Sequence, residues 1–306
     1  VSYGDPKWRP WVLDDAGSQP FFKQAVEAGI NFFDTADMYS VGASEEVTGR
    51  ALKEYAKLEE CVVATKVFNA MSDGKNMSGL SRKHIVQGCE ASLLRLGIDT
   101  IDLYQIHRVD PLTPLEEVLE ALDLLVRQGK VRYLGASSTW AWKIAKCLGL
   151  SALHGWSRFV SMQNHYNLIY REEEREMMPL CASEGLAVLP WSPLARGLLA
   201  GRPASQTAAT TRGQTDDFIE KLYDHPSDQK VVDAVQSVAS KRGVPPARVS
   251  LAWMLSKPYV TAPIIGATKT HHLQDAVASL ELKLTPEEVL ELESPYQPHA
   301  IKGHKD

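Results

Sequence analysis

Polar residues that could move a proton follow three apolar stretches of the sequence. Asp34 and Tyr39 come after the first of them, within "NFFDTADMYS", and Lys66 and His107 follow two later ones. An acid, a phenol, an ammonium and an imidazole gathered in one place are suited to general acid–base catalysis. Each residue also has an ordinary interpretation, because Asp34 could cap a helix, Lys66 could be solvated and His107 could be a core histidine.

A lysine placed beside a tyrosine would make the phenol a better acid. The pKa of free tyrosine is about 10. An ammonium about 4 Å away, at an effective dielectric constant of about 20, favours the phenolate by about 4 kcal/mol and could lower this pKa by up to about three. We therefore expect Lys66 to lower the pKa of Tyr39, Asp34 to hold the lysine charged, and His107 to hydrogen-bond a substrate oxygen.

The elements that must position these residues alternate along the chain. Seven short stretches rich in Val, Ile and Leu are typical of strands covered on both faces. They span 30–36, 61–66, 101–107, 131–137, 159–164, 186–192 and 260–267. Amphipathic stretches with helix-capping residues predict helices near 18–29, 44–55, 81–97, 113–130, 140–156, 172–185, 227–242, 246–257, 270–281 and 285–294.

This alternation predicts an α/β protein with a parallel sheet. The length of 306 residues and the number of repeats favour one closed (β/α)8 TIM-type barrel over residues 1–306, with a doubly wound open sheet as the alternative. Before the first helix, "VSYGDP" reads as the tail of a first strand and the loop after it. The first strand would therefore be incomplete, and we expect a native upstream segment to close the barrel. The loop 194–226 and the tail 295–306 would cover the active-site face.

Three longer stretches carry a resemblance to a known family. They are "GINFFDTADMYSVGASEEVTGRAL", "LGIDTIDLYQIHR" and "WSPLARGLLAG", and they resemble the aldo-keto reductases, above all the potassium-channel β-subunit-like branch and the general bacterial and fungal reductases. The resemblance runs from residue 1 to about residue 295. It implies a cytoplasmic barrel enzyme that passes a hydride from NADPH to an aldehyde or ketone. The implied catalytic residues are Asp34, Tyr39, Lys66 and His107, with Tyr39 as the proton donor.

The same resemblance implies which residues contact NADP(H). Ser137, Ser138 and Gln163 would hold the nicotinamide carboxamide, and Trp191 would stack on its ring. Ser192, Leu194 and Arg202 would touch the pyrophosphate, with Pro193 in the same cofactor-binding stretch, and Gly266, Thr268, Lys269, His272 and Asp275 would surround the adenosine phosphate. Thr268 stands where many relatives have arginine, so Lys269 would take over the charge next to the 2′-phosphate.

Composition and missing motifs argue against several other classes of protein. A formal net charge of −5, without a basic run longer than two residues, speaks against nucleic acid as a partner. No window of 18 residues is wholly apolar, so we expect no membrane span. The four cysteines are scattered, which predicts no zinc site and no disulfide framework. We expect no metal at His271 and His272 either, because neighbours on a helix point in different directions.

The absence of two glycines separated by one residue excludes the Gly-x-Gly-x-x-Gly fingerprint of dinucleotide-binding sheets. One alternative function stays open, namely an NADP(H)-binding regulatory or scaffold subunit with little turnover, like the channel β subunits. His107 argues against this alternative, because channel β subunits tend to carry asparagine at that place. The sequence names neither the small carbonyl substrate nor the oligomeric state.

Overall fold

The structure is a computed structural model of the chain, and it describes residues 1–201, 215 and 218–304. The chain divides into two compact units. Unit 1 comprises Val1–Met162 together with His304, and unit 2 comprises Gln163–Gly303. That residues 1–306 form a single domain stays a prediction.

Unit 1 is built on parallel strands that neighbour one another in chain order. They are β1 (Phe32–Asp34), β2 (Val62–Val67), β3 (Ile101–Ile106), β4 (Val131–Ser137) and β5 (Phe159–Gln163), the last residue of which already belongs to unit 2. The register pairs Asp34 with Ala64 and Lys66 with Gln105. The carboxyl ends of β1, β2 and β3 therefore lie side by side.

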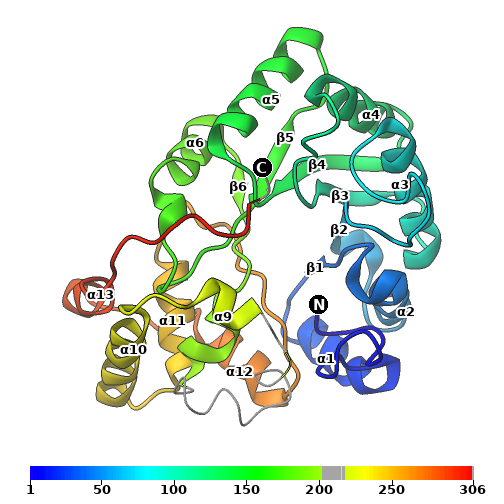
Figure 1. Ribbon diagram of the computed structural model, residues 1–306. Coiled ribbons are helices and arrows are strands. Elements are labelled where there is room, and N and C mark those ends of the chain that lie inside the picture. Colours follow the sequence, from blue (N-terminus) through cyan, green and yellow to red (C-terminus); the bar gives the residue numbers. More distant parts are fainter. Residues whose placement is uncertain (202–214, 216–217, 305–306) are drawn as a thin grey trace. The chain divides into compact units, whose positions relative to one another are not determined.

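Five helices alternate with the strands of unit 1, as the sequence predicts. They are α1 (Asp15–Glu27), α2 (Ala43–Tyr55), α3 (Arg82–Leu96), α4 (Leu115–Arg127) and α5 (Ala141–His154), and Figure 1 shows α2, α3 and α4 along the outer side of β1 to β4. α3 begins after Ser81, whose hydroxyl accepts the His84 N–H, and it ends at Gly97 in the left-handed conformation. Capping residues thus set the bounds of this helix.

Residues on both faces of the central strands are buried. Along β2 every residue from Val63 to Val67 is buried, and along β3 the same holds for all but Asp102. This confirms the prediction of strands covered on both faces. It also means that a charged residue on these strands, such as Lys66, must find its partners inside the protein.

Unit 2 is mainly helical. Its elements are α6 (Met177–Glu184), β6 (Ala187–Val188), α9 (Phe218–Leu222), α10 (Asp228–Arg242), α11 (Pro246–Leu255), α12 (Thr270–Ala278) and α13 (Pro286–Glu293), and β6 follows β5 in the order of the sheet. The indole N–H of Trp253, which is fully buried on α11, donates to Glu293 at 2.7 Å and so ties α11 to α13. No helix in the described ranges is long and apolar enough to cross a membrane.

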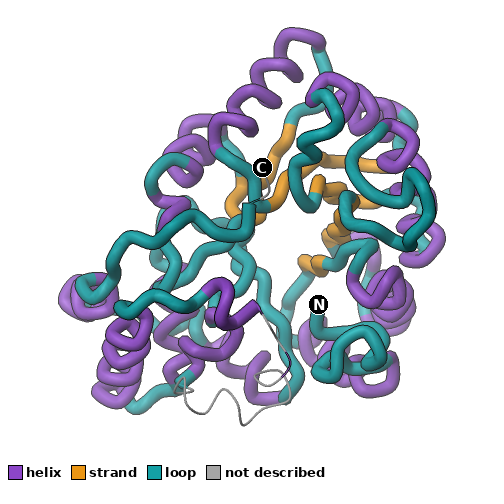
Figure 2. The backbone as a smooth tube through the Cα atoms, in the orientation of Figure 1, coloured by secondary structure: helices purple, strands orange, loops and turns teal. Residues whose placement is uncertain are grey.

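Two predicted strands of unit 2 are wrong or too long. The strand predicted at 260–267 is a loop (Figure 2) that keeps one bridge, from Val260 to Val188. The strand predicted at 186–192 is reduced to β6 and a bridge at Trp191. Pro190 and Pro263 interrupt these two stretches, and proline removes the N–H that a ladder needs. The α/β fold with a parallel sheet is confirmed with six strands, whereas the closed (β/α)8 barrel stays a prediction.

The packing of α2 on α3 depends on one glycine. A Cβ added at Gly49 would lie 2.1 Å from the carbonyl oxygen of Leu96 and 2.7 Å from its carbonyl carbon. Because these are backbone atoms, the helices would have to separate. We expect Gly49→Ala to lower the free energy of unfolding by about 1–3 kcal/mol, measured by urea denaturation.

Gly149→Ala is the matched control on α5, because an added Cβ there meets nothing within 4 Å. We expect this variant to be neutral or to gain up to about 1 kcal/mol from helix propensity. If both variants had the stability of the parent, the claim that α2 and α3 approach too closely at Gly49 to admit a side chain would be wrong.

Candidate active site

Unit 1 brings together all four residues for which the sequence predicts catalytic roles. Asp34 is the last residue of β1, Lys66 is the penultimate residue of β2, and His107 directly follows β3. Tyr39 opens the short 3-10 helix Tyr39–Gly42 after β1. Strand pairing in register therefore places the four side chains at one end of the sheet.

A buried ion pair lies at the centre of this group. The Lys66 Nζ atom is 2.6 Å from Asp34 Oδ2 and donates to the Thr35 carbonyl oxygen at 2.7 Å, and the exposed fractions of the two charged side chains are 0% and 5%. Burial lowers the pKa of Lys66, but the Asp34 carboxylate and the Tyr39 phenol raise it, and the net direction is upward. Lys66 is therefore an ammonium at neutral pH.

The Tyr39 ring lies between the lysine and the histidine. The Lys66 Nζ atom is 5.1 Å from the centre of this ring, and the His107 ring meets it edge-on at 5.7 Å between centroids. The expected lowering of the Tyr39 pKa is wrong, because burial raises this pKa by more than the Lys66 ammonium lowers it. The phenol thus keeps its proton at neutral pH, which is the state that a proton donor needs.

Two further side chains orient these groups, and the sequence reasoning missed both. The Gln105 side-chain amide on β3 donates to Asp34 Oδ1 at 3.1 Å, and the Asn69 amide lies 3.2 Å from His107 Nδ1. Because an amide N–H can only donate, Nδ1 accepts and the hydrogen of neutral His107 lies on Nε2. The sequence does carry a signal for Gln105, because a polar glutamine stands inside the apolar run of β3.

A second buried carboxyl group, which the sequence analysis left as structural, lies close to the ion pair. Asp37 accepts the Met38 backbone N–H at 2.6 Å, and burial, followed by the charge of Glu45, raises its pKa to about 7. Glu45 is itself held by Arg95 at 2.6 Å and by Thr65 at 2.5 Å. These contacts join α2 and α3 to the strand ends behind the site.

The predicted cofactor residues of unit 1 follow β4. Ser137 is the last residue of that strand, and Ser138 has a left-handed backbone with φ of 44°. Both side chains are buried, and the Thr139 hydroxyl donates to the Ser137 carbonyl oxygen at 3.1 Å. The backbone thus makes a sharp turn that gives two neighbouring hydroxyls at this strand end.

Unit 2 holds the predicted stacking residue, Trp191. Its backbone N–H donates to the Asn164 carbonyl oxygen at 2.7 Å, next to Gln163 at the end of β5. The indole stacks on His165 with 4.3 Å between centroids and 11° between planes, and His165 stacks in turn on Tyr170 at 4.3 Å. Because the Trp191 side chain remains half-buried, it forms a planar platform with aromatic rings behind it.

The residues predicted near the pyrophosphate lie on the chain that follows. The carbonyl oxygen of Ser192 accepts the Asn167 side-chain amide at 2.9 Å, and the backbone of Ser192 is left-handed. Pro193 is buried, and Leu194 precedes the short 3-10 helix Ala195–Ala200. Arg202 lies outside the described residues.

The residues predicted near the adenosine phosphate gather around the start of α12. They are Gly266, Thr268, Lys269, His272 and Asp275. Lys269 is exposed at the N-cap of α12, and the Thr268 backbone N–H donates to His272 Nδ1 at 3.3 Å. Asp275 is paired with Arg248 at 2.8 Å, so its charge is balanced within unit 2.

The buried Asp37 predicts a pH dependence of stability. Between its ordinary pKa of 3.8 and the folded value of about 7, the folded state keeps a proton that the unfolded state has lost, so stability falls as pH rises through this window. Asp37→Asn removes the titration. We expect the unfolding free energy of the parent to fall across this window by up to about 4 kcal/mol relative to the variant, measured by urea denaturation at several pH values.

Asp73→Asn is the control for the change in net charge, because Asp73 is exposed. Its stability curve should run parallel to that of the parent. If the Asp37→Asn curve also ran parallel to the parent, the raised pKa of Asp37 would be wrong.

Comparisons with known proteins show which family the chain resembles. The Versiconal hemiacetal acetate reductase of Aspergillus parasiticus is 43% identical, over 98% of this chain and 93% of that protein. A putative aryl-alcohol dehydrogenase of Schizosaccharomyces pombe is 40% identical, over 99% of this chain and 92% of its own length. An aldo-keto reductase of Fusarium vanettenii is also 40% identical, over 98% of this chain and 87% of that protein. The sequence profile of the Aldo/keto reductase family matches residues 3–297, and the chain therefore belongs to the aldo-keto reductase family.

Proposed function

We propose that this protein is an NADP(H)-dependent oxidoreductase that reduces an aldehyde or ketone to the alcohol. The observation that carries the proposal is the buried Asp34–Lys66 ion pair next to the protonated Tyr39 phenol. The relatives support the reaction class, since they are described as reductases or as putative dehydrogenases. None of these descriptions supports the alternative of a regulatory or scaffold subunit.

Reduction of a carbonyl group requires a hydride at carbon and a proton at oxygen. NADPH, when bound, supplies the hydride. Tyr39 donates its phenolic proton to the carbonyl oxygen, and the Lys66 ammonium stabilises the phenolate that this transfer leaves behind. His107, with its hydrogen on Nε2, donates a hydrogen bond that orients the same carbonyl oxygen. In the oxidation direction, the Tyr39 phenolate takes the proton back.

Burial of the ion pair makes this proton transfer selective. The raised pKa of Tyr39 keeps the proton on the phenol until a carbonyl oxygen with developing negative charge competes for it. Asp34 and the Thr35 carbonyl oxygen fix the ammonium in place, so no reorganisation is needed when the phenolate forms. Preorganised charges of this kind stabilise a transition state more strongly in a buried site than in water.

The residues of each unit fit the proposed cofactor. In unit 2, the half-buried face of Trp191, backed by His165, suits a planar nicotinamide ring. Lys269 and the N–H groups of the first turn of α12 suit a phosphate, because such groups have no partner within the helix. The preference for NADP(H) over NAD(H) rests on Lys269. The buried polar side chains of Ser137 and Gln163 suit the carboxamide.

An aromatic residue beside the proton donor suggests the substrate class. The Trp8 ring lies 6.4 Å from the Tyr39 ring between centroids, tilted by 39°. A flat aromatic aldehyde could pack against such a surface with its carbonyl oxygen at Tyr39. The proposal therefore takes aromatic aldehydes as the first substrates to test. We place the reaction in the cytoplasm, with small molecules rather than nucleic acid or membranes as partners.

Replacement of one hydroxyl group tests the assigned proton donor. Tyr39→Phe removes the acid and keeps the ring between Lys66 and His107. Because general acid catalysis contributes about 10²- to 10⁴-fold, we expect carbonyl reduction to fall by that factor while NADPH affinity stays near normal. The decrease of NADPH absorbance with a panel of aldehydes measures the rate, and fluorescence titration measures NADPH binding.

Tyr133→Phe is the matched control, because Tyr133 is exposed on β4. It should reduce aldehydes at the rate of the parent. An unchanged rate in Tyr39→Phe would refute the proton-donor role. A parent protein that binds NADPH and yet reduces no aldehyde or ketone would favour the regulatory-subunit alternative instead.

A further inference from the structure

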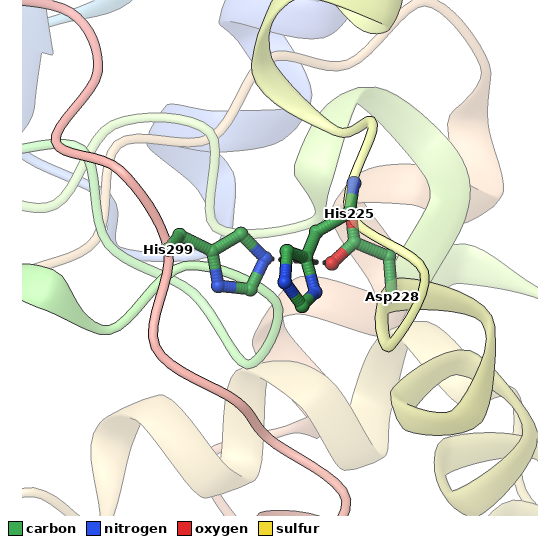
Figure 3. A group of neighbouring side chains, drawn as sticks. All are labelled: His225, Asp228 and His299. Carbon is green, nitrogen blue, oxygen red and sulfur yellow. Dashed lines mark hydrogen bonds and ion pairs between the residues drawn. The ribbon is translucent and has the colours of Figure 1, made fainter.

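Three side chains of unit 2 with metal-binding atoms lie together, and the sequence predicts no role for any of them. His225 precedes α10, Asp228 is the first residue of α10, and His299 lies on the tail after α13. One ligand atom from each lies within 4.8 Å of the others. Figure 3 shows the His299 ring and the Asp228 carboxylate pointing toward each other, with the His225 ring alongside.

The hydrogen bonds of His299 leave a place for a positive charge. Its Nδ1 atom lies 2.6 Å from the Gln297 carbonyl oxygen, and because a carbonyl oxygen only accepts, Nδ1 carries a hydrogen. Its Nε2 atom lies 2.7 Å from Asp228 Oδ1. In the neutral ring this nitrogen would present a lone pair to a carboxylate oxygen. A proton therefore occupies this place at the observed distance, and a metal cation could replace it if the two atoms moved apart.

The surroundings of His299 and Asp228 are those of metal ligands. A ligating histidine usually donates its other ring N–H to a backbone carbonyl or a carboxylate, which fixes the ring. His299 does so toward Gln297, and its backbone N–H is fixed by Glu172 at 2.7 Å. Asp228 Oδ2 accepts the His225 backbone N–H at 3.1 Å. Both His299 and Asp228 are buried, so their geometry is held by packing as well.

His225 can supply the third ligand atom. Its ring lies 4.4 Å from the His299 ring between centroids, with the planes tilted by 42°. The Ser227 hydroxyl oxygen is 2.7 Å from His225 Nδ1, and the Ser227 backbone N–H lies 3.2 Å from the same nitrogen. Because a backbone N–H can only donate, Nδ1 accepts here and the hydrogen of the neutral ring lies on Nε2. Metal binding through Nε2 requires the other tautomer, in which Nδ1 carries the hydrogen and donates it to the Ser227 hydroxyl oxygen.

The charges around His299 favour a bound cation. Asp228 is buried and presents its carboxylate to His299. A bound divalent cation would balance this negative charge. Glu172 adds a second carboxylate nearby, through its contacts with the His299 backbone and the Tyr296 hydroxyl.

We propose that His225, Asp228 and His299 bind a divalent transition-metal ion of the zinc class. Two imidazoles and one carboxylate form a donor set that zinc accepts, with water as the fourth ligand. Bonds of about 2.0–2.1 Å in a tetrahedron require ligand atoms about 3.3 Å apart. The His299 and Asp228 atoms, now 2.7 Å apart, would therefore separate slightly as the ion enters. The ion fastens the tail to the first turn of α10, and its role is structural.

Cobalt binding tests this proposal, because tetrahedral Co²⁺ absorbs visible light. The full-length protein is stripped with a chelator, dialysed and titrated with Co²⁺ and then with Zn²⁺. We expect one Co²⁺ per chain with a visible absorption band, displacement of Co²⁺ by Zn²⁺, and a higher melting temperature in the metal-bound protein. His299→Gln and His225→Gln should each weaken binding by at least about tenfold.

His154→Gln is the matched control, because it removes an exposed histidine of α5 in unit 1. It should bind Co²⁺ as the parent does. Asp228→Asn, checked for folding by circular dichroism, keeps the shape of the side chain but loses its charge, and it should also bind more weakly.

If the parent binds no Co²⁺ and no Zn²⁺ at micromolar concentrations, only a proton lies between His299 and Asp228, and the proposal is wrong. It is equally wrong if His299→Gln and His225→Gln bind Co²⁺ as tightly as His154→Gln. Neither result would bear on carbonyl reduction, which Tyr39→Phe tests independently.

Discussion

A lysine ammonium buried inside a sheet is the constraint on which the rest of unit 1 depends. Taking such a charge out of water costs several kcal/mol unless a well-placed counter-charge offsets the cost. Asp34 and the Thr35 carbonyl oxygen supply that compensation for Lys66, and only the parallel register of β1 and β2 brings them within reach. Fold and candidate site therefore depend on the same pairing of strands.

The polar side chains behind the ion pair extend this dependence to the helices. Gln105 from β3 fixes Asp34, and the Glu45–Arg95 pair joins α2 to α3 close to the same strand ends. Asp37, with its raised pKa, lies in this layer. A carboxyl group with a pKa of about 7 is only partly ionised at neutral pH, so it adds less than a full negative charge near Lys66.

The sequence predicts much of unit 1 because its signals are local. Apolar runs predict the strands, and the strand predicted at 131–137 coincides with β4. Polar residues at the ends of such runs predict the four members of the candidate site, because parallel strands bring their carboxyl ends together. Gln105 and Asn69 were missed because their partners are set by register, which short-range patterns do not show.

Other features could not be predicted because they depend on the whole environment of a group. The pKa of Tyr39 was expected to fall because a pairwise estimate includes the Lys66 charge and omits burial, which is the larger influence. In unit 2, prolines shortened two strands that composition alone favoured. The His299–Asp228 contact joins residues 71 positions apart, and the spacing of histidines along the chain does not reveal it.

The central claim is that the buried Lys66 ammonium makes proton donation by Tyr39 possible. Single-turnover reduction of an aromatic aldehyde by the NADPH-bound protein tests this most directly, with the double variant Asp34→Asn/Lys66→Met, which removes both charges and leaves no unpaired buried ion. The account predicts a rate at least about 100-fold lower, with the fold and NADPH binding retained. A double variant that is folded, binds NADPH and reduces the aldehyde at the rate of the parent would contradict it.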